Sequence, residues 1–160
     1  MLKTIIKLLI PALTGALLFV AGFTVTASAQ SDDGLPPMSQ YQAMLDHGKK
    51  SGWIAFANHG KRQFIYFSHL QTLHCRLKEI RYSINSTDLD KRFGLVKCIP
   101  QLPFSLPSKP KISDTVLMLP LGTAQSVAVQ VVWKDGRESD VAIYKPCEGV
   151  GDRTCTQLVK

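Results

Sequence analysis

Short apolar runs separated by polar turns fill most of the chain after residue 52, and they predict β-strands. Residues 53–57 and 64–67 are rich in aromatic and β-branched side chains, and Asn58, Gly60 and Lys61 lie between the two runs. Such a pair of runs around Asn and Gly predicts a β-hairpin. Both runs are apolar on both faces, so we expect central strands or strands with an apolar patch left for a partner.

The segment 73–84 changes its alternation midway. Its apolar residues occupy odd positions up to 77 and even positions from 80 on: Leu73, Cys75, Leu77, Ile80, Tyr82 and Ile84. Because side chains of a strand alternate between two faces, this change requires one extra residue. We expect a β-bulge near Lys78-Glu79, or a break into two strands. The bulge would place four charged residues on the outer face: Arg76, Lys78, Glu79 and Arg81.

The remaining strands are expected over 93–99, 116–119 and 127–133. The last of these alternates valine with smaller or polar residues, and Asp135-Gly136 follows it before further apolar positions at 141 and 143. That pattern predicts a second hairpin. Four prolines exclude regular structure over 100–112. This segment is better interpreted as a crossover between two sheets than as a linker, because each half of the chain would hold too little core.

About seven strands and no long helix predict an all-β fold. We expect a small antiparallel two-sheet β-sandwich of immunoglobulin-like architecture, with a short N-terminal helix. The helix is expected over 40–47, with Ser39 as its N-cap, Tyr41 and Leu45 on one face, and Gly48 at its end. A Cys–Trp–Cys order with the spacing of an antibody-type domain is not present.

The first 29 residues have the pattern of a secretory signal peptide. Lys3 and Lys7 form a short basic start, residues 8–23 follow as a long apolar run, and Ala27-Ser28-Ala29 supplies the small residues of a cleavage site. Residues 30–38 predict a flexible tether, and 39–160 a single disulfide-stapled β domain. If the signal segment were not cleaved, residues 8–25 could span a bilayer, and only then do we expect contact with a membrane.

The four cysteines, Cys75, Cys98, Cys147 and Cys155, all follow the signal segment. An even number in an exported chain predicts two disulfides and a periplasmic or secreted location. Four cysteines allow three pairings. Cys147 and Cys155 are eight residues apart around two glycines, so we expect them to pair locally and to leave Cys75 with Cys98.

Charge is unevenly distributed along the chain. The formal net charge is +7, and it falls to +5 without Lys3 and Lys7; residues 49–97 hold ten basic residues against three acidic ones. This distribution predicts a basic binding face for an anionic envelope component or an acidic protein. Ordinary solubilising charge is the alternative, and nucleic acid is a poor candidate for an exported protein. The expected face consists of Lys61, Arg62, Arg76, Lys78 and Arg81.

The aromatic residues of the first hairpin have two interpretations. They are Trp53, Phe56, Phe64, Tyr66 and Phe67. In the simpler interpretation, these side chains pack in the core. In the other, one ring face is exposed beside Lys61-Arg62 and forms a binding patch.

Motifs for catalysis or cofactor binding are not present in the sequence. The histidines do not have zinc-site spacing, and neither a Gly-x-Ser-x-Gly elbow nor a glycine-rich phosphate loop occurs. We therefore expect no catalytic residue, metal or cofactor. The sequence predicts an exported, non-catalytic binding module of the bacterial cell envelope. The alternatives are a periplasmic hydrolase with a loop-built site around His59 and His69, and a periplasmic inhibitor of a hydrolase.

Overall fold

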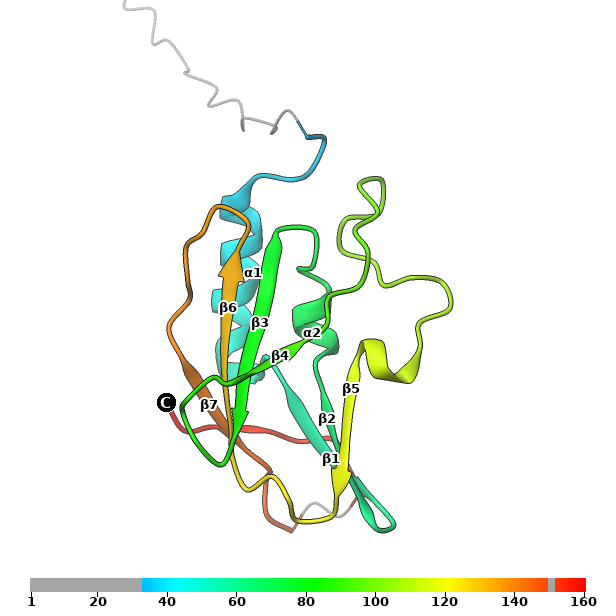
Figure 1. The fold of residues 1–160 in the computed structure, drawn as a ribbon, viewed down its shortest axis with the longest axis vertical. Helices are drawn as coiled ribbons and strands as arrows, with labels where there is room; N and C mark the ends of the chain where they lie inside the picture. The colour runs from blue at the N-terminus through cyan, green and yellow to red at the C-terminus, as the bar shows by residue number, and fades with distance from the viewer. Residues whose placement is uncertain (1–32, 150–151) are drawn as a thin grey trace, which may run out of the picture.

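The computed structural model describes residues 33–149 and 152–160, so the predicted signal peptide over 1–29 lies outside the described residues. The described residues form eight strands in two antiparallel sheets and one helix of 14 residues (Figure 1). A mostly β fold is therefore confirmed, whereas the immunoglobulin-like sandwich stays a prediction. The elements are α1 (Met38–Ser51), β1 (Ala55–His59), β2 (Arg62–Tyr66), α2 (Ser68–Gln71), β3 (Leu77–Ile84), β4 (Lys91–Phe93), η1 (Ile112–Asp114), β5 (Val116–Pro120), β6 (Val127–Trp133), β7 (Ala142–Lys145) and β8 (Gln157–Leu158).

The smaller sheet has the order β1-β2-β5. β1 and β2 are the predicted hairpin, and its last pair is His59 with Arg62. Gly60 in the turn has φ +60°, a left-handed conformation that favours glycine. β5 pairs with the other side of β2, so β2 is central and β5 lies at an edge of the sheet.

The larger sheet has the order β4-β3-β6-β7-β8, and β6 at its centre is buried along almost its whole length. The predicted bulge is confirmed. Leu77 pairs with Trp133 but Glu79 pairs with Val132, so Lys78 is the extra residue of β3.

β3 begins at Leu77, not at residue 73 as the pattern indicated. Residues 68–76 form α2 and a series of turns, in which the amide of Arg76 donates to the carbonyl of Leu73 (3.0 Å) and the amide of Leu77 to that of His74 (3.3 Å). Arg76 therefore precedes the strand and does not share its outer face.

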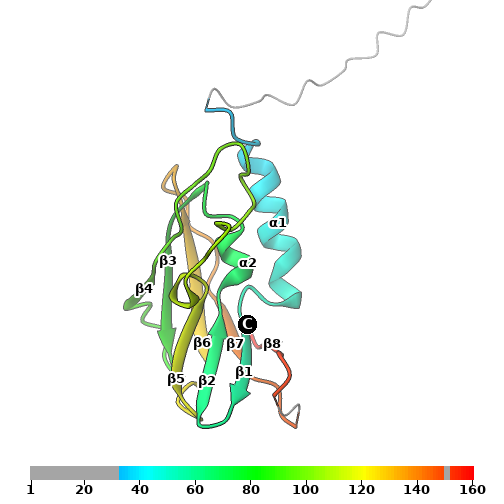
Figure 2. The ribbon, with the colours of Figure 1, turned by 90° about the vertical axis from the view of Figure 1, so that its right-hand side faces the viewer.

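Residues 155–160 connect the two sheets. Phe56 of β1 and Cys155 exchange two backbone hydrogen bonds of 2.8 and 2.9 Å, while Ile143 of β7 bonds to Val159 and Lys160. α1 lies against β8 (Figure 2). One cluster of buried side chains from α1, α2 and both sheets forms the core.

The helix α1 is longer than the predicted 40–47. It begins at Met38 after Pro37 and ends at Ser51, and Gly52 with φ +112° follows it. Gly48 does not end the helix but is buried within it. A Cβ atom at Gly48 would lie 2.2 Å from Nε2 of His69, so this glycine permits the helix and the His69 ring to approach closely.

Residues 33–38 of the predicted tether pack against the domain. Leu35 is only 5% exposed, and Asp33 forms an ion pair with Arg76. The described part of this segment is therefore not a free tether.

The prediction of a strand over 93–99 was wrong beyond Phe93, where β4 ends. From Gly94 on, the backbone is held by a side chain and not by a neighbouring strand: Nε2 of Gln71 donates to the carbonyl of Gly94 (2.6 Å), and the amide of Val96 donates to Oε1 of Gln71 (3.2 Å). Residues 100–111 form turns and bends without strand or helix, as their prolines predicted, whereas residue 112, the last of the predicted irregular segment, begins η1.

Both predicted disulfides are present, Cys75–Cys98 and Cys147–Cys155. Two disulfides suggest an oxidising environment of the extracellular type. Within the part of the chain that the structure describes, none of the helices has the length and apolarity to span a membrane.

Candidate functional site

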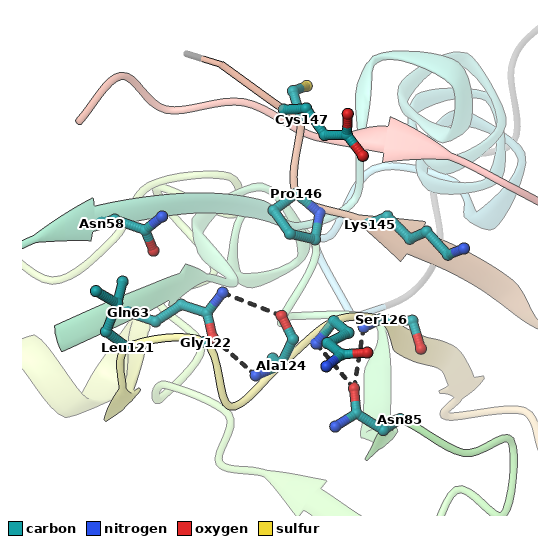
Figure 3. A pocket seen from close by; sticks show the side chains of 12 residues that line it. Asn58, Gln63, Asn85, Leu121, Gly122, Ala124, Ser126, Lys145, Pro146 and Cys147 are labelled. Carbon is teal, nitrogen blue, oxygen red and sulfur yellow. Dashed lines mark hydrogen bonds between the residues drawn. The ribbon is translucent and has the colours of Figure 1, made fainter. Parts of the chain in front are cut away.

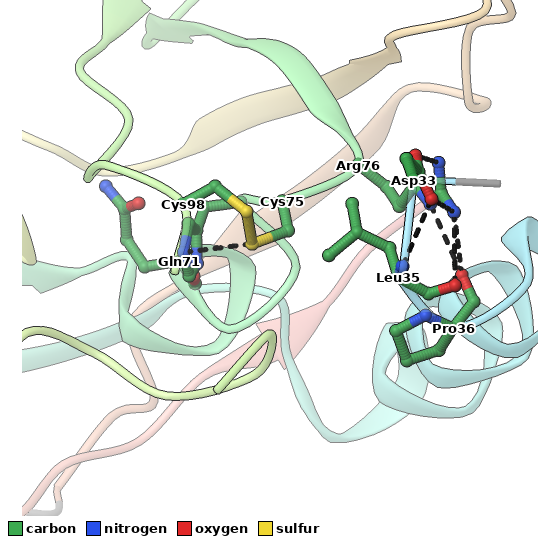
Figure 4. The surroundings of a disulfide bond; sticks show 8 residues. Asp33, Leu35, Pro36, Gln71, Cys75, Arg76 and Cys98 are labelled. Carbon is green, nitrogen blue, oxygen red and sulfur yellow. Dashed lines mark hydrogen bonds and ion pairs between the residues drawn. A yellow bond between two sulfur atoms is a disulfide. The ribbon is translucent and has the colours of Figure 1, made fainter. Parts of the chain in front are cut away.

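The five residues of the predicted basic face do not lie together. Lys61 and Arg62 lie at the β1–β2 turn, whereas Lys78 lies at the far end of the molecule, where β3 begins (Figure 1). The guanidinium of Arg76 donates to Asp33 (2.5 Å) and to the carbonyl of Pro36 (3.0 Å), and its side chain is 12% exposed (Figure 4). Arg76 therefore fastens the N-terminal segment to the domain.

Arg81 is neutralised on the outer face of the larger sheet. Its guanidinium lies 2.7 Å from carboxylate oxygens of both Glu79 and Glu138, and Arg92 lies 2.6 Å from Glu79. The hydrogen bonds from Arg81 and then Arg92 lower the pKa of Glu79 below its ordinary value, although partial burial opposes them. This surface is a balanced ion network and not a basic face.

An exposed apolar face occurs instead on the outer side of the smaller sheet. Residues that pair directly across a sheet share a face, and the pairs His59–Arg62, Phe64–Met118 and Tyr66–Val116 all lie on this side. We call this surface the aromatic face and define it by five residues: His59, Arg62, Phe64, Tyr66 and Met118.

The rings of the aromatic face stack on one another and are only half-buried. The Phe64 and Tyr66 centroids are 6.5 Å apart with nearly parallel planes, and the His59 ring meets Phe64 edge-on at 5.3 Å. Met118 is 42% exposed, and Nη1 of Arg62 lies 3.8 Å from its sulfur. These groups present polarizable apolar area together with a cation.

Two cations border this face without a carboxylate. Among the ion pairs of the described residues, none involves Lys61 or Arg62. Together with Met118, Leu119 and Pro120 they line a hollow of about 310 Å³ along β5. The hollow lies where the start of β2 pairs with the end of β5, and β5 itself is an edge strand whose other side has no neighbouring strand among the described residues.

A larger hollow, about 580 Å³, lies where the ends of both sheets meet, and it is lined mainly by polar side chains (Figure 3). Two of its amides are occupied by the fold, whereas Oδ1 of Asn58 is buried without a hydrogen-bond partner among the described residues. Gln63 exchanges two hydrogen bonds with the backbone of Ala124 (2.8 and 3.0 Å), and Oδ1 of Asn85 accepts from the amides of Gln125 and Ser126 (2.8 and 3.1 Å). These side chains position the loop between β5 and β6 and are not free to bind a ligand.

The two histidines of the hydrolase alternative are far apart. His59 ends β1 at the hairpin turn, whereas His69 lies in α2 beyond the other end of β2, which spans about 14 Å at roughly 3.4 Å per residue. Burial, and then the charge of His47, lower the pKa of His69. The structure therefore does not assemble a site from this pair.

Comparison with known proteins finds no matching family model, no matching curated protein and no matching solved structure. The site must therefore be judged from its own chemistry. Sequence reasoning identified Lys61, Arg62, Phe64 and Tyr66 as possible members of a patch but missed Met118 and His59. The sequence predicted a strand over 116–119, but not that it would pair with β2 about 55 residues earlier.

Proposed function

We propose that this protein is an exported, non-catalytic binding module whose aromatic face docks an acidic segment of a partner protein. The observation that carries the proposal is the combination, on one sheet face, of half-exposed stacked rings, an exposed methionine and two cations without carboxylate partners. Monomeric surfaces seldom combine these features unless they bind something.

A protein segment fits this surface better than an anionic polymer. A uniformly charged polymer would use the two cations but would gain little from Phe64, Tyr66 and Met118. An extended segment with acidic and apolar residues could contact both, and the free side of β5 could pair with its backbone. The two disulfides support a place outside the reducing cytoplasm, and we propose the periplasm or the extracellular space.

The test begins with capture of partners from envelope extract by the exported protein, followed by affinity measurement with the purified partner. Reversing both cations, Lys61→Glu with Arg62→Glu, should weaken binding at least about tenfold without changing the melting temperature much. Affinity should also fall as salt rises, because exposed charges are screened over about 10 Å at roughly 0.1 M.

The matched control is Lys78→Glu with Lys134→Glu, which changes the net charge equally on exposed residues in β3 and in the turn after β6. It should leave affinity unchanged. Equal losses in both double variants would mean that net charge alone attracts the partner. Capture of an anionic polysaccharide or lipid without any protein would contradict the choice of partner. Turnover of a small molecule that depends on His59 or His69 would contradict the non-catalytic assignment.

A further inference from the structure

The Cys75–Cys98 disulfide lies beside a buried histidine. His74 is 2% exposed and Cys75 is fully buried, and the turns after α2 direct both side chains into the core. Nε2 of His74 lies 3.5 Å from Sγ of Cys75. Figure 4 shows the surroundings of this disulfide.

A carbonyl orients the histidine ring. Nδ1 of His74 lies 2.5 Å from the backbone oxygen of Gln71, which can only accept a hydrogen bond. In the neutral ring Nδ1 therefore carries the proton, and Nε2 presents its lone pair toward the sulfur. Histidines that bind metals have this arrangement, with one nitrogen fixed by a carbonyl or carboxylate and the other facing the ion.

The segment that carries Cys98 is held in place independently of the disulfide. The side chain of Gln71 binds the backbone of Gly94 and Val96, and also donates to the carbonyl of Asp114 (2.8 Å). Gln71 is itself fully buried. Cutting the S–S bond therefore leaves two hydrogen bonds, to Gly94 and Val96, that keep the start of this segment close to α2, and a third that ties Gln71 to Asp114.

We infer that reduction of the Cys75–Cys98 disulfide converts His74, Cys75 and Cys98 into a binding site for a thiophilic divalent cation such as Zn²⁺. The potential ligand atoms of these three residues lie within 4.8 Å of one another. Zn–N bonds of about 2.0–2.1 Å and Zn–S bonds of about 2.3 Å place N and S about 3.5 Å apart in a tetrahedral site. The distance between Nε2 of His74 and Sγ of Cys75 already has this value, and after reduction the two sulfurs must move apart.

Conversion of the disulfide into a zinc site requires two electrons and two protons from a reductant. A dithiol reductant donates two electrons and two protons, the S–S bond breaks, and the reductant becomes a disulfide. Zn²⁺ then displaces the two thiol protons into solvent, and two thiolates cancel the charge of the metal. The buried site is thus neutral overall, which avoids the free-energy cost of an uncompensated charge. Cys98 is half-buried, which leaves an approach for the reductant and for a water as fourth ligand.

The experiment uses the exported protein with Cys147→Ser and Cys155→Ser, so that only one cysteine pair remains. The protein is titrated with Zn²⁺ against a chromophoric chelator, before and after reduction, and with Co²⁺ as a spectroscopic probe of thiolate ligation. The reduced protein should bind one Zn²⁺ per chain and the oxidised protein none. His74→Gln should weaken binding at least about tenfold, the loss typical even of outer-shell partners. His69→Gln is the matched control and should leave the affinity unchanged.

Tryptophan fluorescence reports whether the reduced chain stays folded, because Trp53 and Trp133 are both buried in the core. Unfolding on reduction before zinc is added would overturn the inference, since the ligands would not be held in place. Equal zinc affinity of the oxidised protein, absence of binding by the folded reduced protein, or unchanged affinity in His74→Gln would each overturn it as well.

Discussion

At the scale of single residues, the close contact between Gly48 and His69 makes this glycine sensitive to substitution. Alanine in a helix is normally about 1 kcal/mol more favourable than glycine. Here the added Cβ would lie 2.2 Å from Nε2 of His69, so Gly48→Ala should instead destabilise the protein by about 1–3 kcal/mol in urea unfolding. Gly94→Ala is the control, because its Cβ would meet nothing within 4 Å. Adding His69→Ala should restore stability, and failure of this rescue would show that the clash is not the cause.

The same histidine should make stability depend on pH. Burial and the nearby His47 lower the pKa of His69 in the folded protein. Between the unfolded value of about 6.5 and the lower folded value, the unfolded chain binds a proton that the folded chain does not. The free energy of unfolding should therefore be lower at pH 5.5 than at pH 7.5. Urea midpoints at the two pH values test this. His69→Gln should reduce the difference, and His59→Gln should preserve it.

At the scale of elements, the bulge in β3 can be removed by deletion. Deleting Lys78 would align Leu77 with Trp133 in the register that the rest of the strand keeps with β6. Deleting Arg81 would turn Tyr82 and the residues after it to the opposite face. The Lys78 deletion should therefore have the higher soluble yield and melting temperature. Arg81→Gln separates register from ion pairing. If it is as damaging as the Arg81 deletion, register is not the cause.

Elements that depend on neighbouring residues were predictable, and those that depend on distant partners were not. Both hairpins, the bulge and the local Cys147–Cys155 pair have a signal within a few residues. From the sequence alone, Gly48 was predicted to end the helix. In the structure a glycine is needed there because the ring of His69, which lies 21 residues later, packs against it. Residues 94–99 were predicted to form a strand. The sequence does not reveal that the side chain of Gln71 binds the backbone at Gly94 and Val96 instead.

The candidate site follows the same rule. The cations at the hairpin turn and the rings of β2 are adjacent in sequence, so a patch containing them could be considered. The sequence does not show that Arg76 and Arg81 are outside the binding face. Their acidic partners, Asp33 and Glu138, lie 43 and 57 residues away in the chain.

At the scale of the whole molecule, residues 155–160 complete both sheets. Deleting 157–160 would remove β8 and leave the backbone of β7 exposed at an edge. The truncated protein should melt at a lower temperature and aggregate more, as light scattering would show. Because β8 stabilises the protein mainly through backbone pairing with β7, replacing residues 157–160 by alanine should lower the melting temperature less than deleting them. Equal damage from both changes would mean that the side chains carry the effect.

The position of these pairings in the chain also determines when the fold can be completed. β1 lies near the beginning of the described domain, yet Phe56 pairs with Cys155, which lies about 100 residues later in the chain. A nascent chain that emerges N-terminus first therefore keeps these edges of β1 and β7 unsatisfied until residues 155–160 have emerged. The two sheets can accordingly be joined only after β8, the last strand in chain order, has left the ribosome.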